Sequence, residues 1–479
     1  MSSIKSKSVP DSDLVVKAGI WYTICNFLFR GMAFITTPIF ARLLTKGELG
    51  SFSNISSWVT ILTVVTAFDL QTSIIRSKLE HEDDMDSYIW SILSLTSIAT
   101  LAIYFIVNIF PGFFTNFFET DMKYIHIMFA YLFFAPAYQM LITKQRAFYK
   151  YKSFVALTGI TIVSSTILSL FLVLVMQNKY AGRMIGYYLP YILVGAIIYI
   201  YLIFKGKRIK LKYWKYACVI CIPLVPHVLS MYLLGSSDKI LITKICGSEY
   251  TAIYSIAYNC YQIVALLFDS MNKAWSPWLM ENLHYEKYKE IRKTSQMYIL
   301  IFFLLIILIL LFVPEIIFIL GGGQYEMAIY CLPPLISGCM FQFVYTMYVN
   351  IEFYEKKTLG VACATMIATV VNIVLNLIFL PSNPKQGYII ASYTTLIGYM
   401  VLFVLHYFLV KKMKMDFVYN IKQITGVLIL SCIFALLISL LYHNIFIRYL
   451  IILLYVCLLL KEIYKYRKNI LGFLKKNKS

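Results

Sequence analysis

The sequence predicts an all-α polytopic membrane protein with about fourteen transmembrane helices. Three observations support this fold class. Hydrophobic residues make up 60% of the 479 residues and charged residues only 14%, whereas a soluble domain carries about 25% charged residues. Apolar runs near 20 residues recur from residue 18 to residue 466, and a helix of that length spans a bilayer while satisfying its own backbone hydrogen bonds. The third observation is the uneven distribution of basic residues between alternate loops.

The predicted helices follow the apolar runs and are separated by short polar turns. They cover residues 18–40, 50–75, 88–110, 122–143, 154–176, 183–204, 217–238, 249–276, 297–320, 327–350, 357–380, 387–410, 421–442 and 445–466. The first helix is long enough to span and follows a polar segment, so we expect a signal anchor that stays in the protein. The longest turn, residues 277–296, is expected to form an amphipathic surface helix.

Basic residues predict the orientation of these helices. An even number of spans puts both termini on the same side of the membrane. The tails and loops on that side hold 32 of the 43 Lys and Arg residues, whereas the opposite loops hold 7. The positive-inside rule therefore places both termini in the cytoplasm. The net charge of +20 then reflects topology and contact with anionic lipid headgroups, and it indicates no nucleic-acid partner.

The cysteines and histidines predict no metal centre. Most of the ten cysteines lie inside apolar segments, and the pair Cys218 and Cys221 has no second pair at zinc spacing. None of the six histidines pairs with another at metal-ligand spacing. No loop is long enough for a soluble catalytic domain. We therefore expect no cofactor, no metal and no enzymatic activity.

Charged residues inside the predicted spans are candidate functional residues, because each costs about 2.5–3.5 kcal/mol or more to insert. Arg30 shares one face of the first helix with Asn26 and Thr37, so this polar stripe is expected to line a wet interior. Arginine binds phosphate through two parallel hydrogen bonds. The alternative is a structural arginine that snorkels or pairs with a carboxylate.

Two further spans carry an aspartate. Asp69 is predicted about three-quarters along the second helix, where it would pair with Arg30 or take up a coupling proton or sodium ion. Asp238 lies beside Lys239 near the outer end of the seventh helix. These two residues would form either an interfacial charge pair or part of a functional site.

The eighth predicted helix carries four polar residues on one face. Tyr258, Gln262, Asp269 and Lys273 follow helical spacing, and the last two form an i,i+4 ion pair in the favourable order. Lys273 is close enough to the cytoplasmic surface to snorkel. Tyr258 would either stack on a sugar or pack as an ordinary aromatic residue.

The two halves of the chain show a weak internal repeat. Residues 50–53 (GSFS) open one predicted helix, and residues 252–255 (AIYS) open another six helices later. Each of these helices carries an aspartate further along, at Asp69 and Asp269 respectively. Transporters are commonly built from such repeats, with the substrate path between them.

Three stretches carry a resemblance to a known family. They are residues 19–53 (GIWYTICNFLFRGMAFITTPIFARLLTKGELGSFS), 223–255 (PLVPHVLSMYLLGSSDKILITKICGSEYTAIYS) and 350–381 (NIEFYEKKTLGVACATMIATVVNIVLNLIFLP). In the first stretch the matching positions are Arg30, Pro38, Arg42, Glu48, Gly50 and Phe52. Together the stretches resemble the polysaccharide transport (Wzx-type oligosaccharide flippase) family of the multidrug/oligosaccharidyl-lipid/polysaccharide exporter superfamily.

This resemblance implies two six-helix bundles around a central cavity, two additional C-terminal helices, and transport by alternating access. The implied domains are a cytoplasmic tail (1–17), an N-terminal bundle (18–204), a basic cytoplasmic linker (205–216), a C-terminal bundle (217–410), an additional helix pair (421–466) and a basic cytoplasmic tail (467–479).

The resemblance also implies a function. The protein would move an undecaprenyl-pyrophosphate-linked oligosaccharide from the inner to the outer leaflet of a bacterial plasma membrane, for O-antigen or capsule biosynthesis. The implied substrate-binding residues are Arg30, Asn26, Lys239, Lys273, Tyr258 and Gln262, and the ion-coupling or charge-pair residues are Asp69, Asp238 and Asp269. A coupling proton or sodium ion and a glycan polymerase are further candidate partners.

Two alternatives to this function stay open. One is a multidrug or small-molecule exporter of the same superfamily. The other is a membrane-embedded glycan-assembly enzyme, such as a polymerase, a ligase or an acyltransferase, for which His227 and His406 inside predicted spans would be the candidate catalytic residues.

Overall fold

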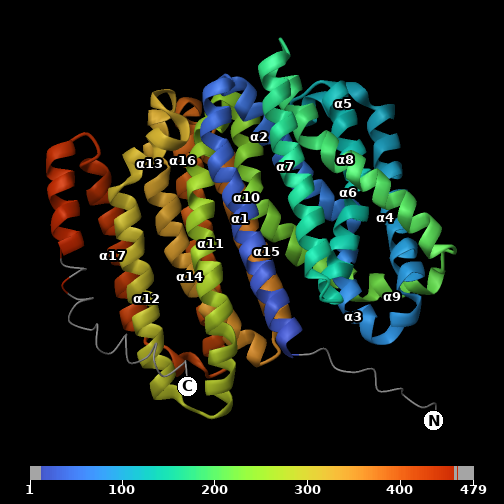
Figure 1. The fold of residues 1–479 in the computed structure, drawn as a ribbon. Helices are drawn as coiled ribbons and strands as arrows, with labels where there is room; N and C mark the ends of the chain where they lie inside the picture. The colour runs from blue at the N-terminus through green and yellow to red at the C-terminus, as the bar shows by residue number, and fades with distance from the viewer. Residues whose placement is uncertain (1–11, 458–460, 462–479) are drawn as a thin grey trace.

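The computed structural model describes residues 12–457 and 461, and in this part of the chain it contains helices and turns but no strand (Figure 1). The long helices are α1 (Ser12–Leu43), α2 (Lys46–Ala67), α4 (Met85–Ile109), α6 (Met122–Ala147), α7 (Tyr151–Val175), α8 (Lys179–Gly206), α10 (Val225–Cys246), α11 (Ser248–His284), α12 (Tyr288–Leu311), α14 (Leu332–Tyr354), α15 (Thr358–Phe379), α16 (Gly387–Lys412) and α17 (Ile421–Leu440). The all-α fold class predicted from the sequence is confirmed.

Shorter elements connect or extend these helices. They are η1 (Leu70–Thr72), α3 (Ser73–His81), η2 (Glu82–Asp84), α5 (Pro111–Phe118), α9 (Leu211–Cys221), η3 (Ile222–Leu224), α13 (Val313–Gly321), η4 (Gly323–Tyr330), η5 (Pro384–Gln386) and η6 (Asp416–Val418). A last apolar helix, Ile445–Cys457, follows α17 and is called the C-terminal helix below.

Every predicted transmembrane range holds helical residues. In the described part of the chain, eleven helical segments are long and apolar enough to cross a membrane, and η4 with α14, bent by 49°, makes a twelfth. The two remaining predicted ranges are occupied by α1 and by the C-terminal helix.

Two predicted segments differ from the structure. The second predicted helix, residues 50–75, is broken because Phe68 and Asp69 take the left-handed conformation, with φ of 49° and 52°. Asp69 therefore lies just beyond the end of α2 and not three-quarters along a helix. Residues 277–296 do not form a separate surface helix: α11 continues to His284, and α12 begins at Tyr288 after a turn with Glu286 at φ 53°.

The N-terminal helices lie on one side of the molecule and the C-terminal helices on the other, with α1, α10 and α11 between them (Figure 1). On the first side α8 packs against α4, α6 and α7, and on the second α14 packs against α11 and α16. The helix α2 crosses this division, because it packs closely against α10 and α11. The helix α17 packs on the outside of α12 and α14.

The two sides are joined tightly where α1 ends and α2 begins, at the upper end of Figure 1. A Cβ added to Gly50 of α2 would lie 1.7 Å from the carbonyl oxygen of Ser248 and 3.1 Å from the amide nitrogen of Ala252. Only glycine permits this approach. The Arg42 guanidinium of α1 also donates hydrogen bonds to carbonyl oxygens of α13, at 3.1 Å to Ile319 and 3.3 Å to Phe318. These contacts define the sealed end of the molecule.

The opposite end carries turns rich in basic residues. The helices α3 and α9, the turn between α11 and α12, and the start of α1 all lie at this lower end in Figure 1. The segments near it include residues 205–216, with six Lys or Arg residues, and residues 411–422, with four. The placement of this basic end in the cytoplasm stays a prediction from the positive-inside rule.

Candidate functional site

Two adjacent cavities lie between the N-terminal and C-terminal helices. The first, called the Arg183 cavity, has a volume of about 310 Å³ and is bounded by α1, α2, α7, α8, α10 and α11. Its polar lining includes Thr36, Thr37, Ser53, Ser56, Ser165, Thr166, Arg183, Lys239, Ser255 and Asn259. Most of these groups are neutral hydroxyls, and both charged residues are cations.

The second, called the Tyr258 cavity, has a volume of about 340 Å³ and lies between α2, α10, α11, α14 and α16. It shares Ser56 and Lys239 with the first cavity. Its other polar lining residues include Thr60, Ser236, Tyr258, Tyr261, Gln262, Gln342 and Tyr399. The two adjacent cavities are both lined by polar and aromatic residues, and their two charged lining residues, Arg183 and Lys239, are both cations.

Close packing of α7 and α8 positions Arg183. A Cβ added to Gly186 would lie 2.3 Å from the Cα of Ser169, so glycine lets these two helices approach closely. Arg183 Nη1 donates a 2.7 Å hydrogen bond to Ser169 Oγ, and the guanidinium carbon lies 3.7 Å from the ring centre of Phe40 and 4.3 Å from that of Phe52. No carboxylate in the described residues lies within ion-pair distance of Arg183, whose Nε has no hydrogen-bond partner there.

Lys239 of α10 stands where the two cavities meet. Its Nζ lies 4.4 Å from the ring centre of Tyr258, and in the part of the chain that the structure describes it forms no ion pair. Two cations at the centre of a bilayer would cost on the order of 5–7 kcal/mol on insertion scales, which is an upper bound for residues nearer the helix ends. Cation–π contacts return about 0.5–2 kcal/mol each, which offsets part of the cost. The cavity therefore keeps positive charge that an anion can neutralise.

Asp238, the neighbour of Lys239, lies in a separate buried network between α10, α11, α15 and α16. Its carboxylate accepts hydrogen bonds from Tyr254 Oη at 2.6 Å, from Asn376 Nδ2 at 2.7 Å and from Thr395 Oγ1. Asp238 is fully buried and has no cationic ion-pair partner among the described residues. Among the described residues Asp238 and Lys239 form no ion pair, so the first of the two alternatives for them, an interfacial charge pair, is not seen. Asp238 is therefore a buried, hydrogen-bonded carboxylate.

Tyrosines of α11 form one wall of the Tyr258 cavity. The rings of Tyr254, Tyr258 and Tyr261 contact one another in succession, with centres 5.9 and 5.1 Å apart. Tyr261 Oη donates a 2.7 Å hydrogen bond to Gln342 Oε1 and lies 2.6 Å from Tyr399 Oη. These bonds fix the aromatic wall, so Tyr258 presents a positioned ring to the cavity. Gln262, one turn further along α11, lines the same cavity.

Three residues singled out in the sequence lie away from both cavities. Lys273 and Asp269 form a 2.9 Å ion pair whose side chains are 69% and 41% exposed. Exposed pairs of this kind contribute about 0–1 kcal/mol. Asp69 lies beyond the end of α2, where its carboxylate accepts a hydrogen bond from Gln71 Nε2. None of the three lines either cavity.

Arg30 and Asn26 lie on α1, but their side chains are outside the described part of the structure. Thr37, which shares their helical face by spacing, lines the Arg183 cavity. Arg30 is seven residues before Thr37, which is about 10 Å along the helix axis at 1.5 Å per residue. Thr37, the last residue of the predicted polar stripe of α1, therefore lies at the cavity, and helical spacing places Arg30 and Asn26 further along the same face.

Arg183 is the functional candidate that the sequence prediction missed. It is the first residue of the predicted span 183–204, at the edge of the membrane, and the sequence alone does not mark it as a site residue. The signal that could have found it is the run Arg183, Tyr187 and Tyr191, which follows i, i+4, i+8 spacing on α8. All three line the Arg183 cavity.

His406, considered for an enzymatic role, is buried elsewhere. Its Nδ1 lies 2.7 Å from Glu352 Oε1 between α14 and α16, and both side chains are fully buried. The ring of Tyr345 stacks on His406 with centres 5.4 Å apart. Neither His406 nor His227 lines the Arg183 or Tyr258 cavity.

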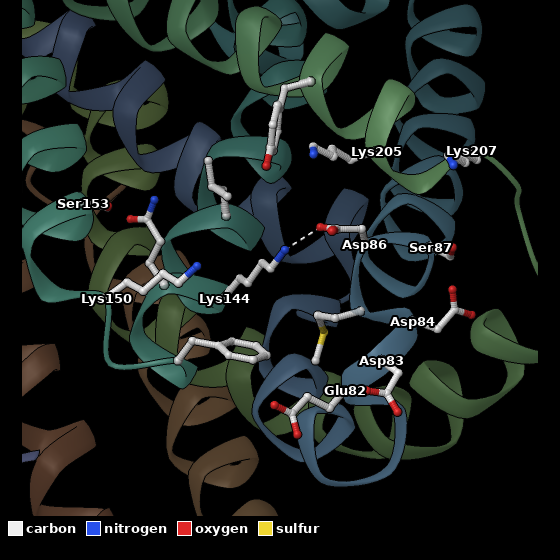
Figure 2. Close-up of a pocket in the computed structure, with 15 residues that line it drawn as sticks. Glu82, Asp83, Asp84, Asp86, Ser87, Lys144, Lys150, Ser153, Lys205 and Lys207 are labelled. Atoms are coloured by element: carbon white, nitrogen blue, oxygen red, sulfur yellow. Dashed lines mark hydrogen bonds and ion pairs between the residues drawn. The ribbon is translucent and has the colours of Figure 1, made fainter. Parts of the chain in front are cut away.

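A larger cleft of about 560 Å³ lies at the basic end, among α4, α6 and α8. Figure 2 shows Lys144, Lys150, Lys205 and Lys207 around the carboxylates of Glu82, Asp83, Asp84 and Asp86. The Lys144 ammonium pairs with Asp86. The Lys210 ammonium pairs with Asp84, which also accepts a hydrogen bond from Tyr213. Because its charges balance, this cleft is a weaker anion site than the Arg183 cavity.

Comparison with known proteins gives one family match and one curated relative. Residues 15–283 match the family described as polysaccharide biosynthesis protein. The chain is also 24% identical over 454 residues to an uncharacterized membrane protein of Methanocaldococcus jannaschii, MJ1068, with 86% of this chain and 87% of the relative covered.

Solved structures share the fold. A lipid II flippase MurJ in an inward closed conformation superposes with a TM-score of 0.71 at 18% identity, covering 94% of this chain and 100% of that chain. An inward-facing multidrug resistance MATE family transporter of the MOP superfamily superposes with a TM-score of 0.59 at 12% identity, covering 83% and 99%. At these identities the likeness shows the fold alone.

Proposed function

The chain belongs to the polysaccharide biosynthesis protein family, and from this premise we propose that it is a flippase for a lipid-linked oligosaccharide. The proposed substrate is an undecaprenyl-pyrophosphate-linked repeat unit, moved from the inner to the outer leaflet of the bacterial plasma membrane for O-antigen or capsule biosynthesis. The fold shared with the lipid II flippase supports translocation of a lipid-linked headgroup.

The observation that carries this proposal is the positive charge inside the Arg183 and Tyr258 cavities. Arg183 and Lys239 face a polar interior without an acidic partner in the described residues. A pyrophosphate supplies the missing negative charge, and arginine binds it through parallel hydrogen bonds. The hydroxyls and tyrosines around these cations provide hydrogen bonds and ring faces for sugars.

Substrate roles follow from position. We propose that Arg183 and Lys239 bind the pyrophosphate and that Arg30, with Asn26, extends this site along α1. Tyr258 and Gln262 would contact the glycan, because both line the Tyr258 cavity. Lys273 is left out of this proposal because it forms an exposed ion pair with Asp269.

Transport of a whole repeat unit requires the helices to separate. Cavities of about 310 and 340 Å³ are at the small end of the ligand-pocket range, which runs from about 300 to 1,000 Å³. We propose that the N-terminal bundle (18–204) rocks against the C-terminal bundle (217–410), so that the site opens alternately to each side. The lipid tail would stay in the bilayer while the headgroup crosses.

We also propose that Asp238 couples transport to a proton or a sodium ion. A fully buried carboxylate is costly unless it is paired or protonated, or binds a cation. Three hydrogen-bond donors hold Asp238 at the meeting point of four helices. A change in its charge would therefore change the packing of α10 against α11, α15 and α16.

The multidrug exporter alternative is less well supported by the cavity. A cationic drug would meet Arg183 and Lys239, and no carboxylate lines either cavity among the described residues. The likeness to the MATE transporter supports the shared fold and does not identify a substrate.

The test is translocation of a labelled undecaprenyl-pyrophosphate glycan in proteoliposomes. We expect Arg183→Ala and Lys239→Ala each to slow translocation by roughly ten- to a hundredfold, because a charge-assisted hydrogen bond contributes about 1.5–3 kcal/mol. Arg183→Lys should retain more activity than Arg183→Ala, because it keeps the charge but loses the planar fork.

The control is Lys385→Ala, which removes an exposed cation outside both cavities. Unchanged translocation in both cavity variants would show that the substrate takes another path. If the wild-type protein moves no lipid-linked glycan at all, the flippase function itself is wrong.

A further inference from the structure

A third cavity, called the Arg448 cavity, lies at the sealed end of the molecule and has a volume of about 620 Å³. It is formed by α13, η4, the turn after α17 and the first turn of the C-terminal helix. Its polar lining residues are Glu315, Glu326, Tyr442, His443 and Arg448. The proposed transport path does not use any of them.

Arg448 gives this cavity a buried cation with unused donors. The residue is 2% exposed, and its Nη2 donates a 2.5 Å hydrogen bond to Glu315 Oε1. Its Nε and Nη1 have no hydrogen-bond partner in the described part of the chain, and the same holds for Glu315 Oε2 and Tyr442 Oη. Buried donors without acceptors are costly. The residues that line this cavity therefore hold buried donors and acceptors that lack partners in the described part of the chain.

The rim of the Arg448 cavity is apolar. Phe318 and Ile319 of α13 are 66% and 55% exposed, and Ile445 of the C-terminal helix is 61% exposed. Exposed apolar side chains at this end of a membrane protein would be in contact with lipid. A charged floor beneath an apolar rim suits an amphiphile with a polar headgroup and hydrocarbon chains better than a free ion.

The charges of the lining residues select among headgroups. Arg448 supplies one positive charge, whereas Glu315 and Glu326 supply two negative charges. An anionic headgroup would gain from Arg448 but be repelled by two carboxylates. A zwitterionic headgroup places its phosphate against the guanidinium and its ammonium against the carboxylates, so that each charge meets its opposite.

We propose that the Arg448 cavity binds a phospholipid with a phosphoethanolamine headgroup. Arg448 donates to the phosphate oxygens from Nε or Nη1, the two guanidinium nitrogens that have no partner in the described residues. The primary ammonium donates to Glu326 and to the free oxygen of Glu315. The acyl chains then lie along the apolar rim between α13 and the C-terminal helix, and the lipid links this helix to the rest of the protein.

The test measures lipid retention by the full-length protein, purified in detergent and exposed to vesicles of phosphatidylethanolamine, phosphatidylcholine or phosphatidylglycerol. Native mass spectrometry then counts the bound lipids. We expect the protein to retain one phosphatidylethanolamine about tenfold more strongly than either of the other two lipids. The reason is that only its primary ammonium makes a charge-assisted hydrogen bond to the carboxylates. Glu326→Gln should abolish this preference without disturbing the fold, because Glu326 is exposed at the rim. Arg448→Met together with Glu315→Gln should abolish retention without leaving an unpaired buried charge.

The matched control is Lys385→Met, which changes an exposed residue outside the Arg448 cavity. Equal retention of the three lipids would overturn the proposal, as would full retention of phosphatidylethanolamine in the Glu326→Gln protein. An excess of inorganic phosphate should leave the lipid in place, and its displacement by phosphate would show a free-anion site instead. The measurement is independent of translocation, so it can fail while the flippase function stands.

Discussion

Adjacent residues of α10 serve different environments. Lys239 lines both central cavities, whereas Asp238 is fully buried among Tyr254, Asn376 and Thr395. Consecutive residues of a helix point about 100° apart, so one residue can face a polar cavity while the next faces a helix contact. Two opposite charges that are neighbours in the sequence therefore need not neutralise each other.

Because Asp238 is a buried carboxylate, we expect the variant Asp238→Asn to change both the ion dependence of translocation and the stability of the protein. We expect translocation to lose its dependence on an imposed proton or sodium gradient, because the amide cannot change its charge. The protein should also lose about 1–3 kcal/mol of stability, because the amide NH2 cannot accept the hydrogen bonds that one carboxylate oxygen accepts. Translocation under each gradient and thermal unfolding in detergent measure these two effects.

Thr394→Val is the control for this experiment. Thr394 donates a 2.6 Å hydrogen bond to Asn376 Oδ1 and does not touch the carboxylate of Asp238. This variant should keep the gradient dependence. A gradient response that persists in Asp238→Asn would rule out Asp238 as the coupling residue.

We expect the free energy of unfolding to depend on pH through Asp69. Burial raises the pKa of Asp69 to about 6, although hydrogen bonds from Thr72 and Gln71 act in the lowering direction. Between about pH 4 and pH 6 the folded protein holds a proton that the unfolded chain releases. Stability from this residue is therefore greatest below about pH 4 and falls as the pH rises to about 6.

The variant Asp69→Asn should lack this part of the pH dependence. Its unfolding temperature, compared with that of the wild type from pH 4 to pH 7, should be less sensitive to pH. Parallel curves for the two proteins across this range would contradict the raised pKa.

At the scale of elements, the starts of α2 and α11 make a close contact beside the Arg183 cavity, which Leu49, Phe52 and Ser255 line. Gly50 brings the two helices so close that any larger side chain would overlap Ser248. The segments in contact are residues 50–53 and 252–255, the two that suggested an internal repeat. If the predicted repeat is real, this contact joins corresponding helices of the two halves, where a gate between repeats would lie.

This contact predicts that a crosslink would stop transport. A Cβ added to Gly47 would lie 3.7 Å from Ser248 Oγ, which is close enough for a disulfide between cysteines at the two positions. We expect the oxidised Gly47→Cys, Ser248→Cys double variant to fall to background translocation and to recover with a reductant. The two single variants serve as controls. Wild-type translocation by the fully crosslinked protein would show that the sealed end does not open.

At the scale of the whole molecule, charge separates the two ends. The turns that follow α8, α11 and α16 are basic, whereas the sealed end carries few cations. The positive-inside rule then places the sealed end outside the cell. With this orientation, the proposed transport cycle would begin with a headgroup that enters from the cytoplasmic leaflet.

Labelling of intact cells tests this orientation. Arg208 and Lys385 are both exposed and lie in turns at the basic end and the sealed end, respectively. With the exposed native cysteines replaced, an impermeant maleimide should label Lys385→Cys but not Arg208→Cys. Labelling of Arg208→Cys in intact cells would invert the proposed orientation and with it the direction of transport.

The sequence alone determined the fold class, the positions of the spanning helices and the separation of charge between the ends. These properties depend on local hydropathy, because a bilayer requires each span to be apolar and to satisfy its own hydrogen bonds. Lys239, Tyr258 and Gln262, predicted from their place in the spans, do line the central cavities. The placement of Asp69 inside a helix was wrong, because two consecutive left-handed residues cannot be read from an apolar run.

Only the tertiary structure decided which polar residues meet. In the sequence Arg183 stands at the edge of a predicted span. In the structure, close packing at glycines between α7 and α8 places its guanidinium over the rings of Phe40 and Phe52 at the cavity. Asp238 joins residues more than a hundred positions away, and Arg448 joins Glu315 at a similar separation. A polar residue in a span must face the protein interior, but its spacing along one helix does not say which other helix supplies its partner. That choice is made by packing between helices distant in the chain.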